Sequence, residues 1–277
     1  MSERQRANDV SGANDGATFR PRLVALDVDG TLVDGANVMS DAVRRVVHAI
    51  HDAGIETVIA TGRGVPGVMD AVDNIGFTQG HAVASNGAVT FRYDPEVELL
   101  DVVRFDPSEA VRRVLEHMPD ALVAVEEVGI GFRLNKPFPD NEISGQFVVE
   151  DVESLIAEPV ARVVIRSADH SRDEFTAIVK DLGLSGTNYY IGYSAWLDLA
   201  PEGVSKASGL ESLCAKLGVA QSDVLAVGDG NNDLEMLQWA GRGVAMGQAP
   251  QPLIDAADDV TGSIDDDGLV TELEKYL

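Results

Sequence analysis

The sequence predicts an α/β protein in which a parallel-sheet core is interrupted by a second, α+β unit. Two observations lead to this prediction. Towards both ends of the chain, short apolar runs alternate with segments of helical periodicity, which is typical of a parallel sheet covered by helices on both faces. In the middle of the chain, strand-like and helix-like segments follow one another without strict alternation. That middle part therefore predicts a separate unit inserted into the core.

The first part of the predicted core alternates strands and helices. Arg22–Val28 is a short apolar run, and a helix begins after the N-cap candidate Ser40 and ends near Gly54. Two further apolar runs, Ile55–Ala60 and His81–Ala84, predict the next strands of the same sheet. A Gly-rich turn separates these two runs.

The middle part begins with a hairpin predicted over Ala88–Phe105, whose turn lies at Asp94 and Pro95. The remaining segments predicted here are a helix at Pro107–His117, strands at Ala121–Glu126, Ile130–Leu134, Val160–Arg166 and Asn188–Tyr193, and a helix at Arg172–Leu182.

The last part of the chain returns to alternating strands and helices. Its predicted segments are helices at Ser205–Leu217 and Asn231–Ala240, strands at Val224–Val227 and Gly243–Met246, and a final helix that ends at Leu277. We therefore expect a loose tail at 1–20, a core made of 21–88 and 196–277, and an inserted unit at 89–195.

The composition excludes several classes of partner. A formal net charge of -25 disfavours nucleic acid and anionic membranes, because both are bound through Lys and Arg. Cys214 is the only cysteine, so the chain has no internal disulfide and no multi-cysteine metal site. The polar N-terminus does not resemble a secretory signal, and no apolar run approaches the ~20 residues of a membrane span. We expect a cytoplasmic protein.

Acidic side chains follow two of the predicted core strands. Asp27 and Asp29 end the first strand, and Asp229 and Asp233 follow the strand at Val224–Val227. Charges at the end of a buried strand are costly unless they are paired or bind a metal, and in open α/β sheets this edge is where ligands bind. Oxygen ligands without His or Cys favour Mg²⁺. The sequence therefore predicts a magnesium site made of these four acids.

A calcium loop is the plain alternative for these segments. An EF-hand loop needs Gly at its sixth position, and counting from Asp27 and Asp229 places Leu32 and Leu234 there. Both segments fail this test.

Two groups predict a site for an anion beside the metal. Thr61, Gly62 and Arg63 follow a strand and open a helix, so their hydroxyl and backbone N–H groups could hold a phosphate. Lys206 near the start of a later helix would add a positive charge. A dinucleotide fingerprint over Gly62–Gly67 is excluded, because the acid required about 20 residues further on is missing.

These segments resemble, in this order, the motifs of the haloacid dehalogenase superfamily of phosphohydrolases, and within it the Cof-like sugar-phosphatase branch. The resemblance spans Leu23–Gly247 and includes Ser85-Asn86-Gly87-Ala88 before the insert. It implies a Rossmann-like parallel-sheet core with an inserted α+β cap domain. The four matching motifs are Asp27-Val28-Asp29-Gly30-Thr31, Thr61-Gly62-Arg63, Lys206 and Gly228-Asp229-Gly230-Asn231-Asn232-Asp233.

The resemblance also implies a role for each site residue. Asp27 would be the nucleophile that forms an aspartyl-phosphate, and Asp29 the general acid and then the general base. Mg²⁺ would be bound by the Asp27 carboxylate, the Asp29 carbonyl and Asp229, and Asp233 would hold Lys206 or a water of the metal shell. Thr61 and Lys206 would stabilise the phosphoryl oxygens. The residues implied to bind or support the phosphoryl group are Gly62, Arg63, Asn86 and Asn232.

Three functions remain open at this point. The first is hydrolysis of a small phosphomonoester, with sugar phosphates the substrate class that the resemblance implies. The second is a phosphotransferase or phosphomutase on the same scaffold, which would keep water away from the phosphoryl group. The third is a non-enzymatic protein that binds a metal or phosphate. The sequence predicts a phosphorylated metabolite as partner and leaves the oligomeric state open.

Overall fold

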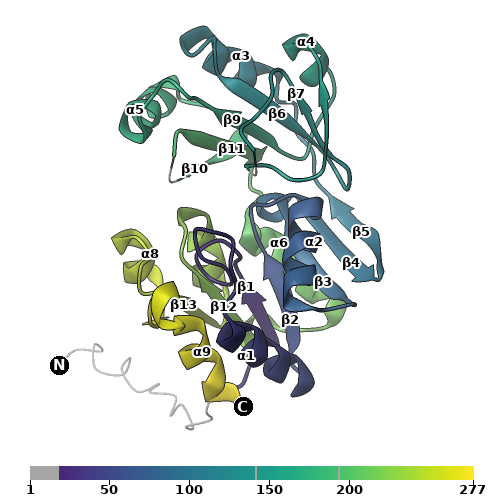
Figure 1. Cartoon of the computed structure of the whole chain (residues 1–277), viewed down its shortest axis with the longest axis vertical. Helices are drawn as coiled ribbons and strands as arrows, with labels where there is room; N and C mark the ends of the chain where they lie inside the picture. The colour runs from purple at the N-terminus through teal and green to yellow at the C-terminus, as the bar shows by residue number, and fades with distance from the viewer. Residues whose placement is uncertain (1–18, 141, 193) are drawn as a thin grey trace, which may run out of the picture.

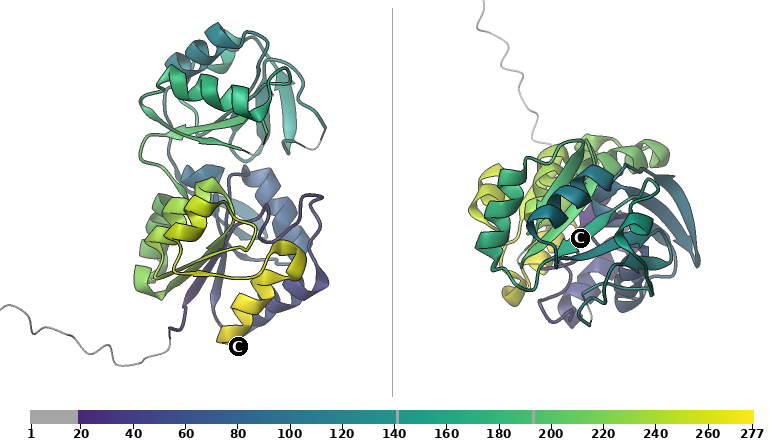
Figure 2. Two further views of the ribbon diagram at one scale, coloured as in Figure 1. Left: turned by 90° about the vertical axis from the view of Figure 1, so that its left-hand side faces the viewer. Right: turned by 90° about the horizontal axis from the view of Figure 1, so that it is seen from above.

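The computed structural model describes residues 19–140, 142–192 and 194–277, and the chain forms two stacked units (Figure 1). Each unit is a β-sheet with helices packed against it. The larger unit, the core, contains the C-terminus, which lies at the end of the molecule away from the smaller unit, the cap (Figures 1 and 2). Most of the predicted tail at 1–20 falls outside the described residues.

Within residues 19–140, 142–192 and 194–277, the core sheet has eight strands in the order β14-β13-β12-β1-β2-β3-β4-β5. The strands from β14 to β3 are parallel, whereas β4 and β5 form an antiparallel hairpin at one edge. The strands are β1 (Leu23–Leu26), β2 (Glu56–Ala60), β3 (Gly80–Ala84), β4 (Val89–Asp94), β5 (Glu96–Val102), β12 (Val224–Gly228), β13 (Arg242–Ala245) and β14 (Asp259–Val260).

Helices cover both faces of the core sheet, as predicted. Successive residues of a strand point to opposite faces, so Val24 and Leu26 of β1 pack with α1, α2 and α9, whereas Leu23 and Ala25 pack with α6, α7 and α8. The core helices are α1 (Asp41–Asp52), α2 (Val65–Ile75), α6 (Lys206–Leu217), α7 (Leu234–Trp239), α8 (Gln251–Ala256) and α9 (Gly268–Leu273). Short 3-10 helices are η1 (Ser85–Gly87), η2 (Gln221–Asp223), η3 (Asn231–Asp233), η4 (Ile264–Asp266) and η5 (Glu274–Tyr276).

The cap sheet, in the part of the chain that the structure describes, has six strands in the order β10-β11-β9-β6-β7-β8. Its helices lie on the face away from the core, and its other face is turned towards the core (Figure 1). The strands are β6 (Leu122–Glu127), β7 (Gly131–Leu134), β8 (Gln146–Val149), β9 (Val163–Arg166), β10 (Thr187–Ile191) and β11 (Trp196–Pro201). The helices are α3 (Ser108–His117), α4 (Val152–Leu155) and α5 (Arg172–Leu182).

The two sheets divide the chain at different points from those predicted. The hairpin β4–β5, expected to open the insert at residue 89, belongs to the core sheet, because β4 pairs with β3 and buries Phe91 and Tyr93 in the core. Conversely β11, expected to resume the core at residue 196, lies between β10 and β9 in the cap sheet. The chain therefore leaves the core after Val102 and returns to it after Pro201.

Among the described residues, no helix combines the length and the apolar character that crossing a bilayer would require.

Candidate active site

The predicted site residues gather at one edge of the core sheet. Asp27 follows β1, Thr61 follows β2, Ser85 follows β3 and Asp229 follows β12. These four strands are neighbours in the sheet and run parallel, so their carboxyl ends meet at the same edge.

Three of the four predicted carboxylates form one buried cluster. Asp27, Asp229 and Asp233 each offer an oxygen atom within 4.8 Å of the others. Their residues are only 4%, 4% and 0% exposed. An all-oxygen donor set of this kind suits a hard divalent cation. The cluster could therefore hold a divalent metal ion.

Lys206 is the positive charge inside this cluster. It is the first residue of α6, is fully buried, and its Nζ lies 2.5 Å from Asp27 Oδ1 and 2.6 Å from Asp233 Oδ1. Burial acts to lower the pKa of Lys206, but the charges of Asp233 and Asp27 outweigh burial and raise it, so the amine stays protonated.

Asp27 is a second group of the cluster whose pKa is raised. Burial raises the pKa of Asp27 well above its ordinary value, and the neighbouring charge of Asp233 adds to this effect, while Lys206 opposes it. Lys206 contacts two of the three clustered carboxylates, those of Asp27 and Asp233, and Asp229 is the third acid of the cluster. Buried carboxylate oxygens of this kind are ligands that a divalent cation prefers, so the residues present fit the predicted metal.

The segment Asp27–Thr31 can pack closely against Asp229 because residue 30 is a glycine. This residue has a φ of +88°, and a Cβ placed on it would lie 2.1 Å from Asp229 Oδ2. A side chain at position 30 would therefore both strain the backbone and displace Asp229. Gln248 braces the same contact, because its Nε2 donates to the Gly30 carbonyl at 2.6 Å and lies 3.3 Å from Asp229 Oδ2.

Asp29 lies apart from the three clustered acids. Its side chain is 61% exposed and forms a two-bond ion pair with Arg63, with Nη2–Oδ1 and Nε–Oδ2 distances of 2.5 and 3.0 Å. Arg63 also donates to Asn37 Oδ1 at 2.9 Å. Burial acts to lower the pKa of Arg63, but the hydrogen bond and charge of Asp29 raise it. The predicted set of four converging acids is thus a set of three, and Arg63 orients the fourth.

Thr61, Gly62 and Asn232 line the same site, with Asn86 buried behind them. The Thr61 hydroxyl accepts a hydrogen bond from the Arg63 amide at 3.2 Å. Asn232 Nδ2 donates to Asn86 Oδ1 at 2.9 Å, and Gly62 packs closely on the Asn86 side chain. Asn86 therefore supports the residues that face the site rather than facing it itself.

A cleft of about 1790 Å³ lies between this edge and the cap. Asp27, Asp29 and Asp229 lie on its core side, and the cap sheet's uncovered face lies opposite. The cap side carries an apolar and aromatic lining with two cations, one of them paired with an acid. The cap residues of this lining include Phe132, Leu134, Phe138, Ile143, Arg162, Arg172, Tyr190, Trp196 and Asp198.

Trp196 shows what the sequence could not reveal about this lining. Its type alone favours a core aromatic, yet it is half-buried and lines the cleft. The ring packs edge-on against Phe138 at 6.2 Å, and Nε1 donates to Asp198 Oδ2 at 3.0 Å. Only the pairing of β11 within the cap sheet determines which face Trp196 occupies.

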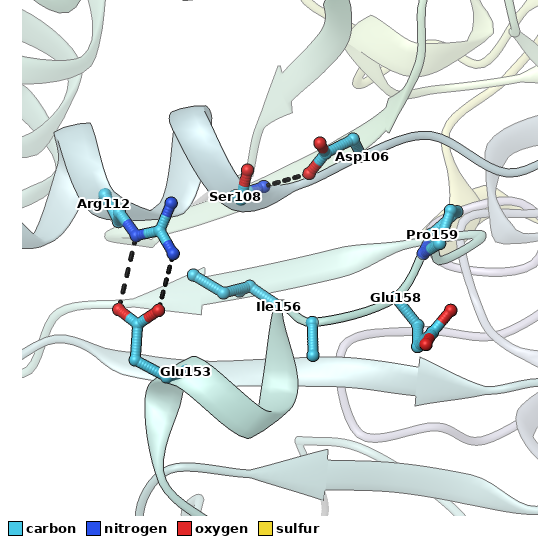
Figure 3. A pocket seen from close by; sticks show the side chains of 8 residues that line it. Asp106, Ser108, Arg112, Glu153, Ile156, Glu158 and Pro159 are labelled. Carbon is cyan, nitrogen blue, oxygen red and sulfur yellow. Dashed lines mark hydrogen bonds and ion pairs between the residues drawn. The ribbon is translucent and has the colours of Figure 1, made fainter.

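A second cavity of about 360 Å³ lies in the cap between α3 and α4 (Figure 3). Arg112 and Glu153 form an ion pair across it. No predicted site residue lines this cavity, whereas Asp27, Asp29, Thr61 and Asp229 line the cleft.

Known proteins resemble this chain over most of its length. The model of the haloacid dehalogenase-like hydrolases matches residues 24–273. Phosphoglycolate phosphatase of Methanoculleus marisnigri is 31% identical over 92% of this chain and 96% of its own. HMP-PP phosphatase of Cronobacter sakazakii is 30% identical over 84% and 86%. A solved phosphatase of the haloalkanoate (HAD) superfamily from Bacteroides thetaiotaomicron superposes with a TM-score of 0.75 at 28% identity, over 96% and 98%. The chain therefore belongs to the haloacid dehalogenase-like hydrolases, as an enzyme of the phosphatase type.

Proposed function

We propose that this enzyme hydrolyses a small phosphomonoester in a Mg²⁺-dependent reaction through an aspartyl-phosphate on Asp27. The observation that carries the proposal is the environment of Asp27. Its carboxylate lines the cleft at the end of β1, is held by Lys206, and lies within 4.8 Å of the carboxylates of Asp229 and Asp233.

The metal would be held by the carboxylates of Asp27 and Asp229, the backbone carbonyl of Asp29, and Asp233 either directly or through water. When bound, Mg²⁺ supplies positive charge that offsets repulsion between the carboxylate nucleophile and an anionic phosphate. The same charge would allow Asp27 to stay ionised despite its burial.

The chain's own residues supply the remaining chemistry. An Asp27 oxygen attacks phosphorus in line, and the bond to the leaving oxygen breaks as Asp29 gives that oxygen a proton. Asp29, now ionised, takes a proton from water as the water oxygen attacks the phosphorus of the acyl-phosphate. The Asp27–phosphorus bond breaks and phosphate leaves. Lys206 and Thr61 stabilise the phosphoryl oxygens in both steps.

The relatives and the cleft support the proposed substrate class. The named relatives are phosphatases of small phosphorylated compounds, and sugar phosphates are the class that the resemblance of the motifs implies. The aromatic cap lining, with Trp196 beside Phe138, offers flat apolar contact to the alcohol part of the substrate. The cap would thereby select the leaving group while the core performs the chemistry.

The first test is phosphate release from a panel of small phosphomonoesters with Mg²⁺ or EDTA. Asp27→Asn removes the nucleophile and should lower turnover by about 10³-fold or more. The control Asp52→Asn, at the end of α1 and away from the cleft, should keep full activity. Mg²⁺ should also raise the melting temperature of the wild type but not of Asp229→Asn, a readout that does not need turnover.

Undiminished turnover in Asp27→Asn would contradict the nucleophile. Transfer of phosphate to an added alcohol without free phosphate would instead indicate a phosphotransferase. A wild type that binds Mg²⁺ and phosphate but turns over no substrate would point to a binding protein.

A further inference from the structure

The segment Ser85–Gly87, which follows β3, ties the phosphate-binding residues together. The Ser85 amide donates to the Arg63 carbonyl at 2.8 Å, and the Asn86 amide donates to the Thr61 carbonyl at 3.1 Å. The Asn86 side chain accepts from Asn232, and η1 packs against α6, the helix that begins with Lys206. The position of this loop therefore fixes Thr61 and Asn232 relative to Lys206.

The loop adopts a backbone conformation that its residues do not favour on their own. Ser85 and Asn86 both have φ values of +53°, in the left-handed region. Residues with a Cβ enter this region at a cost, and Asn tolerates it better than Ser does. Contacts from the surroundings must hold Ser85 in place.

Glu126 of the cap provides the contact at Ser85. It lies on β6, is only 4% exposed, and its Oε2 accepts a hydrogen bond from Ser85 Oγ at 2.5 Å. This bond joins a cap strand to a core loop. Burial raises the pKa of Glu126, and the nearby charge of Arg162 opposes this shift.

The second oxygen of Glu126 lies against the start of α2. A Cβ placed on Gly64 would come within 2.8 Å of Glu126 Oε1, and the Val65 amide faces the carboxylate. Gly64 precedes this helix and offers no side chain to cap it. The Glu126 carboxylate thus lies beside the N-terminus of α2, where a negative charge is favourable, although Oε1 has no hydrogen-bond partner among the described residues. The turn that it contacts follows directly on Thr61-Gly62-Arg63.

We propose that Glu126 is a positioning residue for phosphoryl transfer. From the cap, its carboxylate holds Ser85 and the first turn of α2, and through them Thr61, Asn86 and Asn232, in the geometry that binds the phosphoryl group. This inference rests on the proposed function. It gives the cap a second task, because Glu126 acts on the phosphoryl half of the reaction whatever the leaving group.

Four variants separate this role from a general effect on folding. Glu126→Ala removes the acceptor, Glu126→Gln keeps an acceptor oxygen for Ser85, and Ser85→Ala removes the donor. The matched control is Glu127→Ala, the next residue of β6, whose exposed carboxylate pairs with Arg133 instead. Each variant is first checked by circular dichroism and thermal melting.

Kinetics give the first readout. Glu126→Ala should lower kcat by about ten-fold or more, by the same factor for every substrate, since small misplacements of binding groups are costly. Glu126→Gln and Glu127→Ala should stay within about two-fold of the wild type. The double variant Ser85→Ala/Glu126→Ala should have a kcat no lower than that of Glu126→Ala alone, because each substitution removes the same hydrogen bond between Ser85 and Glu126. Mg²⁺ affinity should not change.

Amide hydrogen exchange gives a second readout that needs no turnover. In Glu126→Ala the amides of Ser85 and Asn86 should exchange at least about ten-fold faster, whereas Glu127→Ala should leave them protected. Unchanged exchange together with unchanged kcat would overturn the proposal. A loss that varies between substrates would also overturn it, since Glu126 would then contact the leaving group. A wild type that releases no phosphate would refute the proposed function, and the exchange rates would still decide whether Glu126 holds the loop.

Discussion

At the scale of single residues, the buried charged groups near the cleft differ in how their burial is compensated. Lys206 is fully buried and yet retains its proton, because Asp27 and Asp233 surround its amine. Glu126 is also buried, but its hydrogen-bond partner is the neutral hydroxyl of Ser85. Ionising Glu126 therefore costs free energy, whereas the charge of Lys206 is compensated by the two carboxylates beside it.

The pKa of Glu126 predicts how stability depends on pH. Its folded-state pKa is raised, so its contribution to stability is fully present below the ordinary value of 4.5 and is lost as pH rises through the folded-state pKa. The Ser85 hydroxyl and the charges of Arg162 and Asp198 act on the carboxylate. The free energy of unfolding of Glu126→Gln minus that of the wild type should therefore grow as the pH rises above 4.5, as urea titrations would show. A constant difference would contradict the shift, and Glu127→Gln serves as the control.

The acids at the strand ends could be predicted from the sequence, because a charge directly after an apolar strand is costly unless it is paired or binds a metal. The role of Arg63 as the partner of Asp29 could not, since either acid of the first motif could have joined the cluster. Glu126 and Trp196 were equally hidden. Both lie on cap strands whose orientation towards the core is set by the packing of two sheets, which no local pattern encodes.

At the scale of helices and strands, end signals and periodicity made most of the fold predictable. Ser40 caps α1 as predicted, with its Oγ accepting from the Val43 amide at 3.1 Å. The short segments β8, α4, α8 and β14 carry too few residues for a periodic pattern to appear. The hairpin β4–β5 was predictable as a hairpin, but its membership of the core sheet depends on pairing with β3, a non-local contact.

Ser40→Ala tests the capping contact at this scale. The Ser40 hydroxyl also donates to Asp267 Oδ1 at 2.6 Å, so the substitution removes two hydrogen bonds and should lower the free energy of unfolding by about 1–2 kcal/mol. Turnover should not change, because Ser40 lies outside the cleft. Chemical denaturation measures the first quantity, with Ser222→Ala as an exposed control. A loss below about 0.5 kcal/mol would show that α1 does not depend on this cap.

At the scale of the whole molecule, the dominant feature is the excess of negative charge. The chain has 46 acidic and 21 basic residues, so its surface charges repel one another while the cleft must attract an anionic phosphate. The sequence predicts the net negative charge of the chain. Where positive side chains lie relative to the cleft becomes visible only in the fold. Lys206 is enclosed by acids, and Arg63 lies at the cleft wall beside Asp29.

Self-repulsion predicts that salt stabilises the enzyme. Between about 0.05 and 1 M KCl, screening should raise the melting temperature by several degrees, because the Debye length falls from about 14 to 3 Å. Sorbitol at equal osmolality should produce a smaller rise, since it does not screen charge. A melting temperature that falls with KCl would show that attractive ion pairs outweigh the net repulsion.

The place of β1 in the core sheet has a consequence for how the enzyme matures. This strand lies between β2, which follows it closely in the chain, and β12, which is made only after the whole cap. The bond between Lys206 and Asp27 likewise joins residues 179 positions apart. A growing chain that has completed β1, β2 and the cap still exposes one edge of β1 and lacks Asp229, Asp233 and Lys206. Asp27, the proposed nucleophile, is thus among the first residues to be synthesised, but the residues around it are completed only later. Recovery of turnover during refolding should therefore mark the pairing of β12 with β1.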